Sequence, residues 1–238
     1  MRSRDFLQPA DAWIHSSIQS VVPESPDQAR FLWNLTDREA GRSVRQNRSS
    51  WVCRLSIADR TVFAKTYDYP SRKDRWRGLF RNTAFARSRA VRERDAAEWL
   101  ATAGLDGSTG LQAPEPLLVA EWRSGPLLRR ALIVTGAAPG RPLDELWPDL
   151  TPSERDGIRR QLGRAVEALH AAGYRDRNLD PRNLIVESRD GTTRITKIDS
   201  PRYRVIPTAL RILGVGRTLA RADRERLERG LRALESAP

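Results

Sequence analysis

The order of the predicted elements constrains the fold of this chain more than any other feature. WVCRLSI (51–57) and TVFAKTY (61–67) are rich in β-branched and aromatic residues, which predicts two β-strands joined by a tight turn. Beyond about residue 140 helical patterns dominate, and the clearest is TPSERDGIRRQLGRAVEALHAAGY (151–174). Strands followed by helices predict an α+β protein with two lobes.

The 151–174 helix carries its own start and stop signals. Thr151 is a capping residue, Pro152 takes the first helical position, and Glu154 completes a capping box. Gly173 ends the helix. We therefore expect a reduced, mainly helical C-terminal lobe over 136–238.

The remaining elements are shorter. Residues 1–135 are predicted to form a small β-rich N-terminal lobe that begins with a loosely structured lead-in over 1–30. We expect one helix here, with Ala96, Ala97, Leu100 and Ala103 on its buried face and Gly104 as its C-cap. This helix spans 92–105. The other predicted elements are an extended run at 113–122, strands at 131–136, 183–188 and 193–200, and an amphipathic helix at 218–235 with Leu219, Ala222, Leu227, Leu231 and Leu234 inward.

The net charge of +12 is concentrated in two segments. Residues 71–92 carry eight bases and one acid, and residues 200–238 carry nine arginines and four acids. Such segments attract polyanions: nucleic acid, an anionic membrane surface or a phosphorylated glycolipid. Simple solvated arginine-rich faces are the alternative, and the aromatic residues within 71–92 fit either a buried core or a lipid-facing amphipathic segment.

Other residue counts exclude several classes of site. The single Cys53 excludes an intramolecular disulfide and a cysteine-based zinc site, and two histidines disfavour a histidine metal site or a hydrolase triad. The sequence has neither an apolar run long enough for a membrane span nor an N-terminal signal pattern. We therefore expect a cytoplasmic protein.

Four sequence motifs follow one another in the order of the protein-kinase signature set. Lys65 lies on a predicted strand, Glu93 on the next helix, RDRNLDPRN (175–183) after the long helix, and Asp199 at the end of a strand. Phosphoryl transfer requires a cation on the phosphates, a carboxylate that holds this cation, and oxygen ligands for a metal ion. Lys65 with Glu93 can supply the first two, and Asn183 with Asp199 the metal ligands.

On these motifs, residues 40–205 resemble the lipopolysaccharide kinase family, the Kdo and heptose kinases of the lipid A inner core. VFAKTYDYP, the basic aromatic linker that follows it, the RERD helix, APEPLLVAE and LIVTGAAPGRPLDEL are similar to that family's pattern. The resemblance implies a bilobal protein-kinase-like fold, ATP with Mg²⁺, and a sugar-hydroxyl acceptor at the cytoplasmic face of the inner membrane.

The catalytic loop departs from this pattern. Asn178 stands where the resemblance places the catalytic aspartate, and Asn is neutral and cannot accept a proton in the same way. Asp176 and Asp180 flank Asn178, and we hypothesise that one of them orients the acceptor hydroxyl. A pseudokinase that binds nucleotide with little or no transfer is the alternative.

Further departures concern the nucleotide loop, the metal loop and the acceptor. The segment 42–50, expected to cover the nucleotide, contains no glycine, and Asp199 is followed by Ser-Pro rather than Phe-Gly. Only 39 residues follow Asp199, which argues for a small or glycolipid acceptor rather than a protein. No recognised nucleic-acid motif supports the second alternative, a nucleic-acid binder.

Three further residues are predicted to have no direct role in the chemistry. Lys73 and Lys197, with Lys65 the only lysines among 42 basic residues, are predicted to be solvated. His170 is predicted to pin the catalytic loop as a structural residue.

Overall fold

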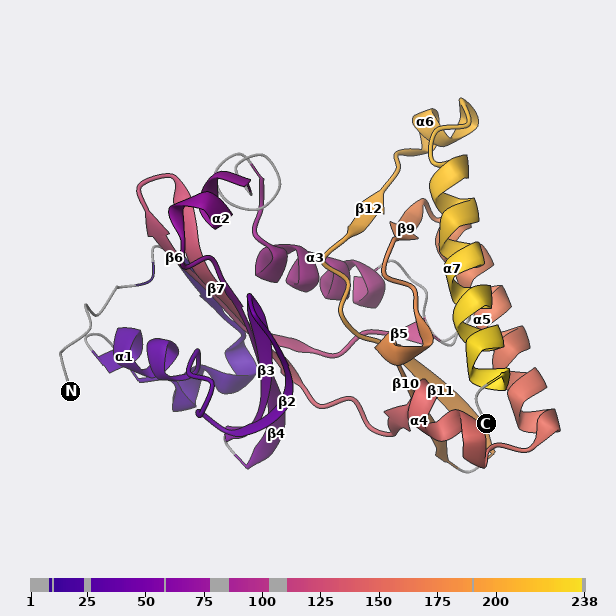
Figure 1. The fold of residues 1–238 in the computed structure, drawn as a ribbon, viewed down its shortest axis with the longest axis horizontal. Coiled ribbons are helices and arrows are strands. Elements are labelled where there is room, and N and C mark those ends of the chain that lie inside the picture. Colours follow the sequence, from indigo (N-terminus) through magenta and orange to yellow (C-terminus); the bar gives the residue numbers. More distant parts are fainter. Residues whose placement is uncertain are drawn as a thin grey trace. The chain divides into compact units, whose positions relative to one another are not determined.

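The computed structural model describes residues 9, 11–23, 27–57, 59–77, 86–102, 111–189 and 191–236. The chain divides into two compact units (Figure 1). Unit 1 comprises residues 1–95 and 115–137, and unit 2 comprises residues 96–114 and 138–238. Each unit is described by itself.

Unit 1 is built on a six-stranded sheet in the order β1-β6-β7-β4-β3-β2, and every neighbouring pair is antiparallel. The two predicted β-runs form neighbouring strands of this sheet, with Lys65 opposite Val52 on one side and Ile133 on the other. The strands are β1 (Asp11–Ile14), β2 (Arg42–Asn47), β3 (Ser50–Ile57), β4 (Arg60–Asp68), β6 (Pro116–Ser124) and β7 (Leu127–Gly136).

The lead-in is more ordered than the sequence predicts. β1 pairs with β6, and the 3₁₀ helix η1 (Ser16–Val21) and helix α1 (Asp27–Asn34) follow it. Ile18 and Leu32 are fully buried in one core cluster with Trp122. These segments are too short to show a clear period, so tertiary burial of a few large side chains decides their structure.

The parity of β4 assigns its side chains to two faces. Val62 and Ala64 enter the core cluster that holds Ile18 and Leu32. Residues at odd positions point to the opposite face, where Tyr67 packs in a second cluster. Ala90, in the first turn of α3 (Arg89–Thr102), belongs to that second cluster, so the sheet and this part of α3 share a core.

The linker between β4 and α3 is only partly described. α2 (Arg72–Arg77) contains Trp76, which is 61% exposed and therefore not a core residue. The aromatic and apolar residues Leu79, Phe80 and Phe85 lie outside the described residues. The predicted buried stripe of α3 is confirmed at Ala96, Ala97 and Leu100, whereas Ala103 and Gly104 also lie outside.

Unit 2 combines a four-stranded sheet, in the order β5-β11-β10-β8, with two long helices and a small β9–β12 pair. The strands are β5 (Leu111–Gln112), β8 (Arg141–Pro142), β9 (Tyr174–Asp176), β10 (Leu184–Arg189), β11 (Thr192–Lys197) and β12 (Tyr203–Val205). The helices are α4 (Leu143–Leu146), η3 (Trp147–Asp149), α5 (Pro152–Ala171), η4 (Pro181–Asn183), α6 (Thr208–Ile212) and α7 (Arg217–Glu235).

Helix α5 begins as its sequence predicts. The Thr151 hydroxyl accepts from the Glu154 amide, and the Glu154 carboxylate accepts from the Thr151 amide, so the capping box is present. The Thr151 hydroxyl also donates to the Glu154 carboxylate at 2.7 Å, and this bond together with the one from the Thr151 amide lowers the pKa of Glu154. Gly173 lies beyond the helix at φ +92°, a conformation that favours glycine.

Helix α7 differs from its predicted face at one turn. Leu227 and Leu231 are buried as expected, but Ala222 is exposed and Asp223 is 1% exposed in its place. The helix also runs close to the 175–183 loop, because a Cβ on Gly230 would lie 2.4 Å from Pro181 Cδ. α7 therefore contributes a buried carboxylate and a close backbone approach to the loop that carries the candidate site.

Among the described residues, no helix combines the length and the hydropathy that crossing a membrane requires.

Candidate functional site

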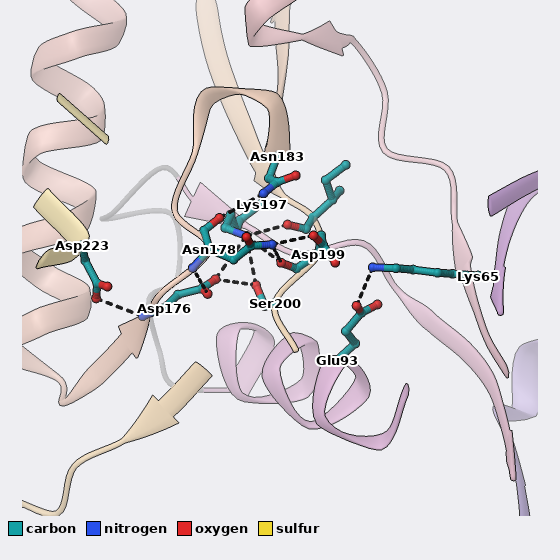
Figure 2. A network of polar contacts seen from close by, with 10 residues as sticks. Lys65, Glu93, Asp176, Asn178, Asn183, Lys197, Asp199, Ser200 and Asp223 are labelled. Atoms are coloured by element: carbon teal, nitrogen blue, oxygen red, sulfur yellow. Dashed lines mark hydrogen bonds and ion pairs between the residues drawn. The ribbon is translucent and has the colours of Figure 1, made fainter. Parts of the chain in front are cut away.

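The first group of candidate residues lies in unit 1. The Lys65 ammonium group on β4 donates to Glu93 Oε1 on α3 at 2.6 Å (Figure 2). The Tyr67 hydroxyl donates to the same oxygen. The side chain of Lys65 is 18% exposed and that of Glu93 is 9% exposed. The structure therefore pairs Lys65 with Glu93, the carboxylate that the sequence analysis proposed as its partner.

The Tyr67 ring lies within a cluster of positive charge. Lys65 Nζ lies 5.2 Å from the ring centroid and the Arg89 guanidinium 5.6 Å from it. Cation–π contacts of this kind stabilise cations that are partly removed from water. Lys65 is thus a mostly buried positive charge that is paired with the Glu93 carboxylate.

The second group lies in unit 2, on the loop between β9 and η4 and on the segment after β11. The Asn178 side-chain amide donates to the Asp199 carbonyl at 2.7 Å and to Asp199 Oδ2 at 2.5 Å (Figure 2). The Asn183 amide in turn donates to the Asn178 carbonyl at 3.0 Å. These bonds bring together three of the predicted site residues.

Asp176 lies beneath this loop and is almost fully buried. Asp176 Oδ1 accepts from the Asn178 backbone amide at 2.9 Å, and Oδ2 accepts from the Ser200 hydroxyl at 2.7 Å. Lys197 Nζ lies 3.1 Å from the same Oδ2. The carboxylate of Asp176 is therefore occupied by groups of its own loop and of the segment around β11.

The prediction that Lys197 is solvated is wrong. Its side chain is 1% exposed, and besides Asp176 it contacts the Ile198 carbonyl at 2.5 Å and the Ser200 hydroxyl at 3.2 Å. A buried ammonium group needs a charge partner and hydrogen bonds to offset its lost hydration, and this one has both. The strand parity of β11 carries a signal for this burial, since Lys197 points to the same face as buried Ile195.

Asp180 has a different neighbour. It caps η4 by accepting from the Arg182 amide, and its two oxygens also accept from the Arg182 guanidinium at 2.9 and 3.0 Å. These hydrogen bonds from Arg182 lower the pKa of Asp180. Of the two carboxylates that flank Asn178, one is thus buried in a network and the other is paired with an arginine.

Asp199 adopts the left-handed conformation at φ +61°, which is uncommon for a residue other than glycine. Strained backbone of this kind persists where its surroundings over-determine it. Here the Asn178 amide holds both the carbonyl and the carboxylate of Asp199, and Lys197 Nζ lies 3.2 Å from the same carbonyl.

The donor set of this loop fits a nucleotide-bound magnesium ion. Asn183 and Asp199 carry oxygen donors, and the Ile198 amide donates to the Asn183 carbonyl at 2.9 Å at one end of the β10–β11 hairpin. Mg²⁺ is usually held by one or two protein groups together with phosphate oxygens and water. Within the part of the chain that the structure describes, no cluster of three or more His, Cys, Asp or Glu could hold a metal.

Asp223 is a site residue that the sequence analysis missed. Its Oδ2 accepts from the Asp176 backbone amide at 3.0 Å and lies 3.4 Å from His170 Nε2. His170 is buried, so it acts as a structural residue behind the loop. The signal for Asp223 is its spacing, because it precedes the buried Leu227 and Leu231 at intervals of four residues on one face of α7.

An aromatic stack supports the start of the same loop. Tyr174 stacks on Trp99 with ring centroids 4.8 Å apart and on Tyr203 at 5.6 Å. Burial raises the pKa of Tyr174 well above its usual value, and the nearby Asp176 carboxylate raises it further. Tyr174 is therefore a neutral packing residue.

Comparisons with known proteins agree with this geometry. Many solved structures match the chain, and one of them is described as WaaP in complex with acyl carrier protein. That alignment covers 92% of this chain and 80% of the other at 16% identity, with a TM-score of 0.56. It confirms the expected α+β, protein-kinase-like fold. No curated protein matches the sequence.

The family comparison concerns the sequence itself. The model that matches residues 27–211 describes the lipopolysaccharide kinase (Kdo/WaaP) family. The match spans well over half of the chain and includes Lys65, Glu93, the 175–183 loop and Asp199. The chain therefore belongs to the lipopolysaccharide kinase (Kdo/WaaP) family.

Proposed function

We propose that this protein is an ATP-dependent phosphotransferase that acts on a sugar hydroxyl of a lipopolysaccharide inner core or a similar glycolipid. The observation that carries the proposal is the 2.6 Å ion pair between Lys65 and Glu93, within a chain of the lipopolysaccharide kinase family. A lysine at a phosphate needs a fixed position, and a carboxylate partner on a packed helix supplies it.

Each group of residues has a distinct role in this proposal. Lys65 contacts the phosphates of ATP and Glu93 holds Lys65 in place. Asn183 and Asp199 would hold Mg²⁺, which when bound neutralises charge on the phosphates. Asn178, Lys197 and Asp176 keep Asp199 in its left-handed conformation.

Asn178 cannot serve as a proton acceptor, so positioning must carry most of the catalysis. Phosphoryl transfer passes through a loose transition state in which positioning and charge stabilisation matter more than strong base catalysis. Asp180 remains the proposed orienting group, since its pairing with the exposed Arg182 is solvent-accessible and can rearrange. Asp176 would act through Asn178 rather than on the acceptor.

The first experiment measures nucleotide binding. ATP with Mg²⁺ should raise the melting temperature of the natural protein, and Lys65→Ala should abolish this increase. Lys73→Ala is the matched control, because Lys73 is exposed and should leave the increase unchanged. An equal ATP effect in all three proteins would contradict the role of Lys65.

The second experiment measures transfer to Kdo- or heptose-bearing acceptors. Phosphate from ATP should appear on the sugar, and Asp199→Asn should lower the rate because it weakens the metal ligand. Asp180→Ala should lower the rate as well, and an unchanged rate would exclude Asp180 as the orienting group.

A pseudokinase is the second candidate function, and one observation favours it. Asn178 stands where the family resemblance predicts the catalytic carboxylate. Its side-chain amide already donates to the carbonyl and the carboxylate of Asp199. ATP-dependent stabilisation without any phosphate on these acceptors would select this candidate. A nucleic-acid binder would instead show salt-sensitive binding to DNA or RNA with no nucleotide effect.

The partners of the protein follow from the same proposal. We propose a glycolipid substrate and peripheral contact with the cytoplasmic face of an anionic membrane through 71–92, where Trp76 is exposed among basic residues. The WaaP structure contains acyl carrier protein, so a carrier protein is a further class of partner to test.

A further inference from the structure

Unit 2 exposes a compact apolar tip that the proposed reaction does not use. Ile212 and Leu213 are each 77% exposed, and Leu210 and Val215 are 43% and 44% exposed. They lie on α6 and the turn after it, beside the start of α7 (Figure 1). Single exposed apolar residues are ordinary, but four within six positions form a patch that marks an interaction site.

The backbone of this tip is held in place. The Val215 amide donates to the Leu210 carbonyl at 3.0 Å, and the Gly214 amide donates to the Arg211 carbonyl at 2.9 Å. At the base of the tip, Arg175 Nε donates to the Gly216 carbonyl at 3.2 Å. The tip is therefore a built turn that presents its apolar side chains outward.

The segment that carries the tip is rich in arginine and contains no acid. Between Asp199 and Asp223 the sequence contains five arginines and no Asp or Glu: Arg202, Arg204, Arg211, Arg217 and Arg221. The Arg211 side chain caps the tip by donating to the Thr208 hydroxyl at 2.7 Å. An apolar centre with a basic rim is typical of segments that enter the interface of an anionic bilayer.

A groove of about 520 Å³ lies behind the tip, between α5 and α7. Its walls include Arg217, Arg221 and Arg224 from α7, with Arg175 beside them. Glu167 and Glu225 are the acids in the lining, and Glu225 Oε1 accepts from the exposed Arg221 Nε at 2.7 Å in a surface pair that a phosphate can replace. Burial lowers the pKa of Arg175, whereas the Asp223 carboxylate raises it. The positive charges of Arg211 and Arg224 lower it further. Like charges gathered in this way favour an anion in the groove.

We propose that the tip 210–215 inserts into an anionic phospholipid bilayer while the arginines of the adjoining groove bind headgroup phosphates. A second copy of this chain is disfavoured as the occupant, because pairing two such rims would place arginines against arginines. A nucleic acid would match the arginines but not the apolar tip. The proposal goes beyond the proposed phosphoryl transfer and does not depend on it.

Vesicle flotation without nucleotide tests the proposal. The natural protein should float with phosphatidylcholine vesicles that contain phosphatidylglycerol and much less with pure phosphatidylcholine. Leu213→Asp should weaken this binding at least about tenfold, the factor that corresponds to burying one leucine side chain. Arg221→Glu should weaken it about fivefold or more, and added salt should reduce that difference.

Matched controls lie in unit 1. Val44→Asp changes an exposed apolar residue outside the tip, and Arg45→Glu changes an exposed arginine outside the groove. Both variants should bind as the natural protein does. Because Leu213, Arg221, Val44 and Arg45 are all exposed, none of these variants should lose the fold, and their melting temperatures verify this.

Several outcomes would overturn the proposal. One is equal flotation of the natural protein and Leu213→Asp, and another is flotation that only Trp76→Ala abolishes, which would assign membrane contact to 71–92 alone. A dimer that Leu213→Asp dissociates would assign the tip to contact between copies. Loss of ATP stabilisation with normal flotation would contradict the proposed function and leave this inference standing.

Discussion

Lys65 and Glu93 lie on a strand and a helix, whereas Asn178 and Asp199 lie on loops held by buried side chains. The first group needs one ion pair and the packing of Tyr67 to stay in place. The second group has an amide at position 178, where the family resemblance predicts a carboxylate, and is supported by Asp176, Lys197 and Asp223 beneath it. The proposed phosphate-binding residues are thus held by an ion pair between regular elements, whereas the proposed transfer loop is held by a buried polar network beneath it.

The largest expected effect tests the network beneath the loop. Lys197→Met leaves the buried Asp176 carboxylate without its charge partner, so it should lower the free energy of unfolding by about 3–5 kcal/mol. Chemical denaturation measures this value. Lys73→Met is the matched lysine control and should change it by less than about 0.5 kcal/mol, because Lys73 is exposed.

A double variant sharpens this test. Lys197→Met combined with Asp176→Asn removes both charges and should recover part of the loss. If Lys197→Met alone is as stable as the natural protein, the loop does not depend on this ion pair and the contrast between the two groups fails.

The next effect concerns Asn178 itself. Asn178→Asp would place two carboxylates in contact at Asp199, so the variant should lose about 2–3 kcal/mol of stability at pH 7. Repulsion raises the folded-state pKa of the pair above its unfolded value, so the loss should shrink as the pH falls toward 4. Mg²⁺ should also reduce the loss, because a cation neutralises the pair.

Unfolding curves at pH 7 and near pH 4, with and without Mg²⁺, measure these changes. Asn178→Ala is the control that removes the amide without adding a charge, so its loss should depend on pH and Mg²⁺ much less than that of Asn178→Asp. The same pH dependence in both variants would show that charge at position 178 is not the cause.

A smaller effect is expected in unit 1. Glu93→Gln removes the charge partner of the half-buried Lys65 and should cost about 1–2 kcal/mol of stability and weaken ATP binding about tenfold. Glu98→Gln, on the same helix, should leave ATP binding unchanged. Calorimetric titration with ATP and Mg²⁺ measures both variants, and equal affinities would remove Glu93 from the site.

The smallest effect concerns Asp180. Arg182 lowers its folded-state pKa, so its contribution to stability is present above the unfolded value of about 3.9 and is lost as the pH falls through the lower folded value. Asp180→Asn should therefore cost less than about 1 kcal/mol at pH 7, and the difference from the natural protein should vanish in acid. Thermal unfolding between pH 2 and pH 7 provides the measurement, and a difference that persists in acid would contradict it.

The sequence predicts local structure where the signals themselves are local. The strands around Lys65 and the capping box of α5 depend on neighbouring residues, and both are confirmed. The fold class and the family resemblance are confirmed as well, because they rest on the order of several such elements.

The sequence could not supply what depends on distant partners. The sequence alone predicts that Lys197 is a surface charge. Its burial follows from the Asp176 carboxylate 3.1 Å away, which the sequence does not reveal. Asp223 breaks an apolar helix face, and only its position behind Asp176 and His170 explains it. The short elements before residue 35 are ordered by burial against the sheet and not by a period of their own.

The unequal burial of the three lysines has a consequence for chemical labelling. Amine-reactive reagents modify accessible lysines, and here Lys73 is exposed, Lys65 is partly covered and Lys197 is enclosed. Labelling at Lys73 should therefore be fast, and labelling at Lys65 should slow when nucleotide binds. Modification of Lys197 should report opening of the loop around Asp199, so mass spectrometry of three peptides would follow three separate parts of one small protein.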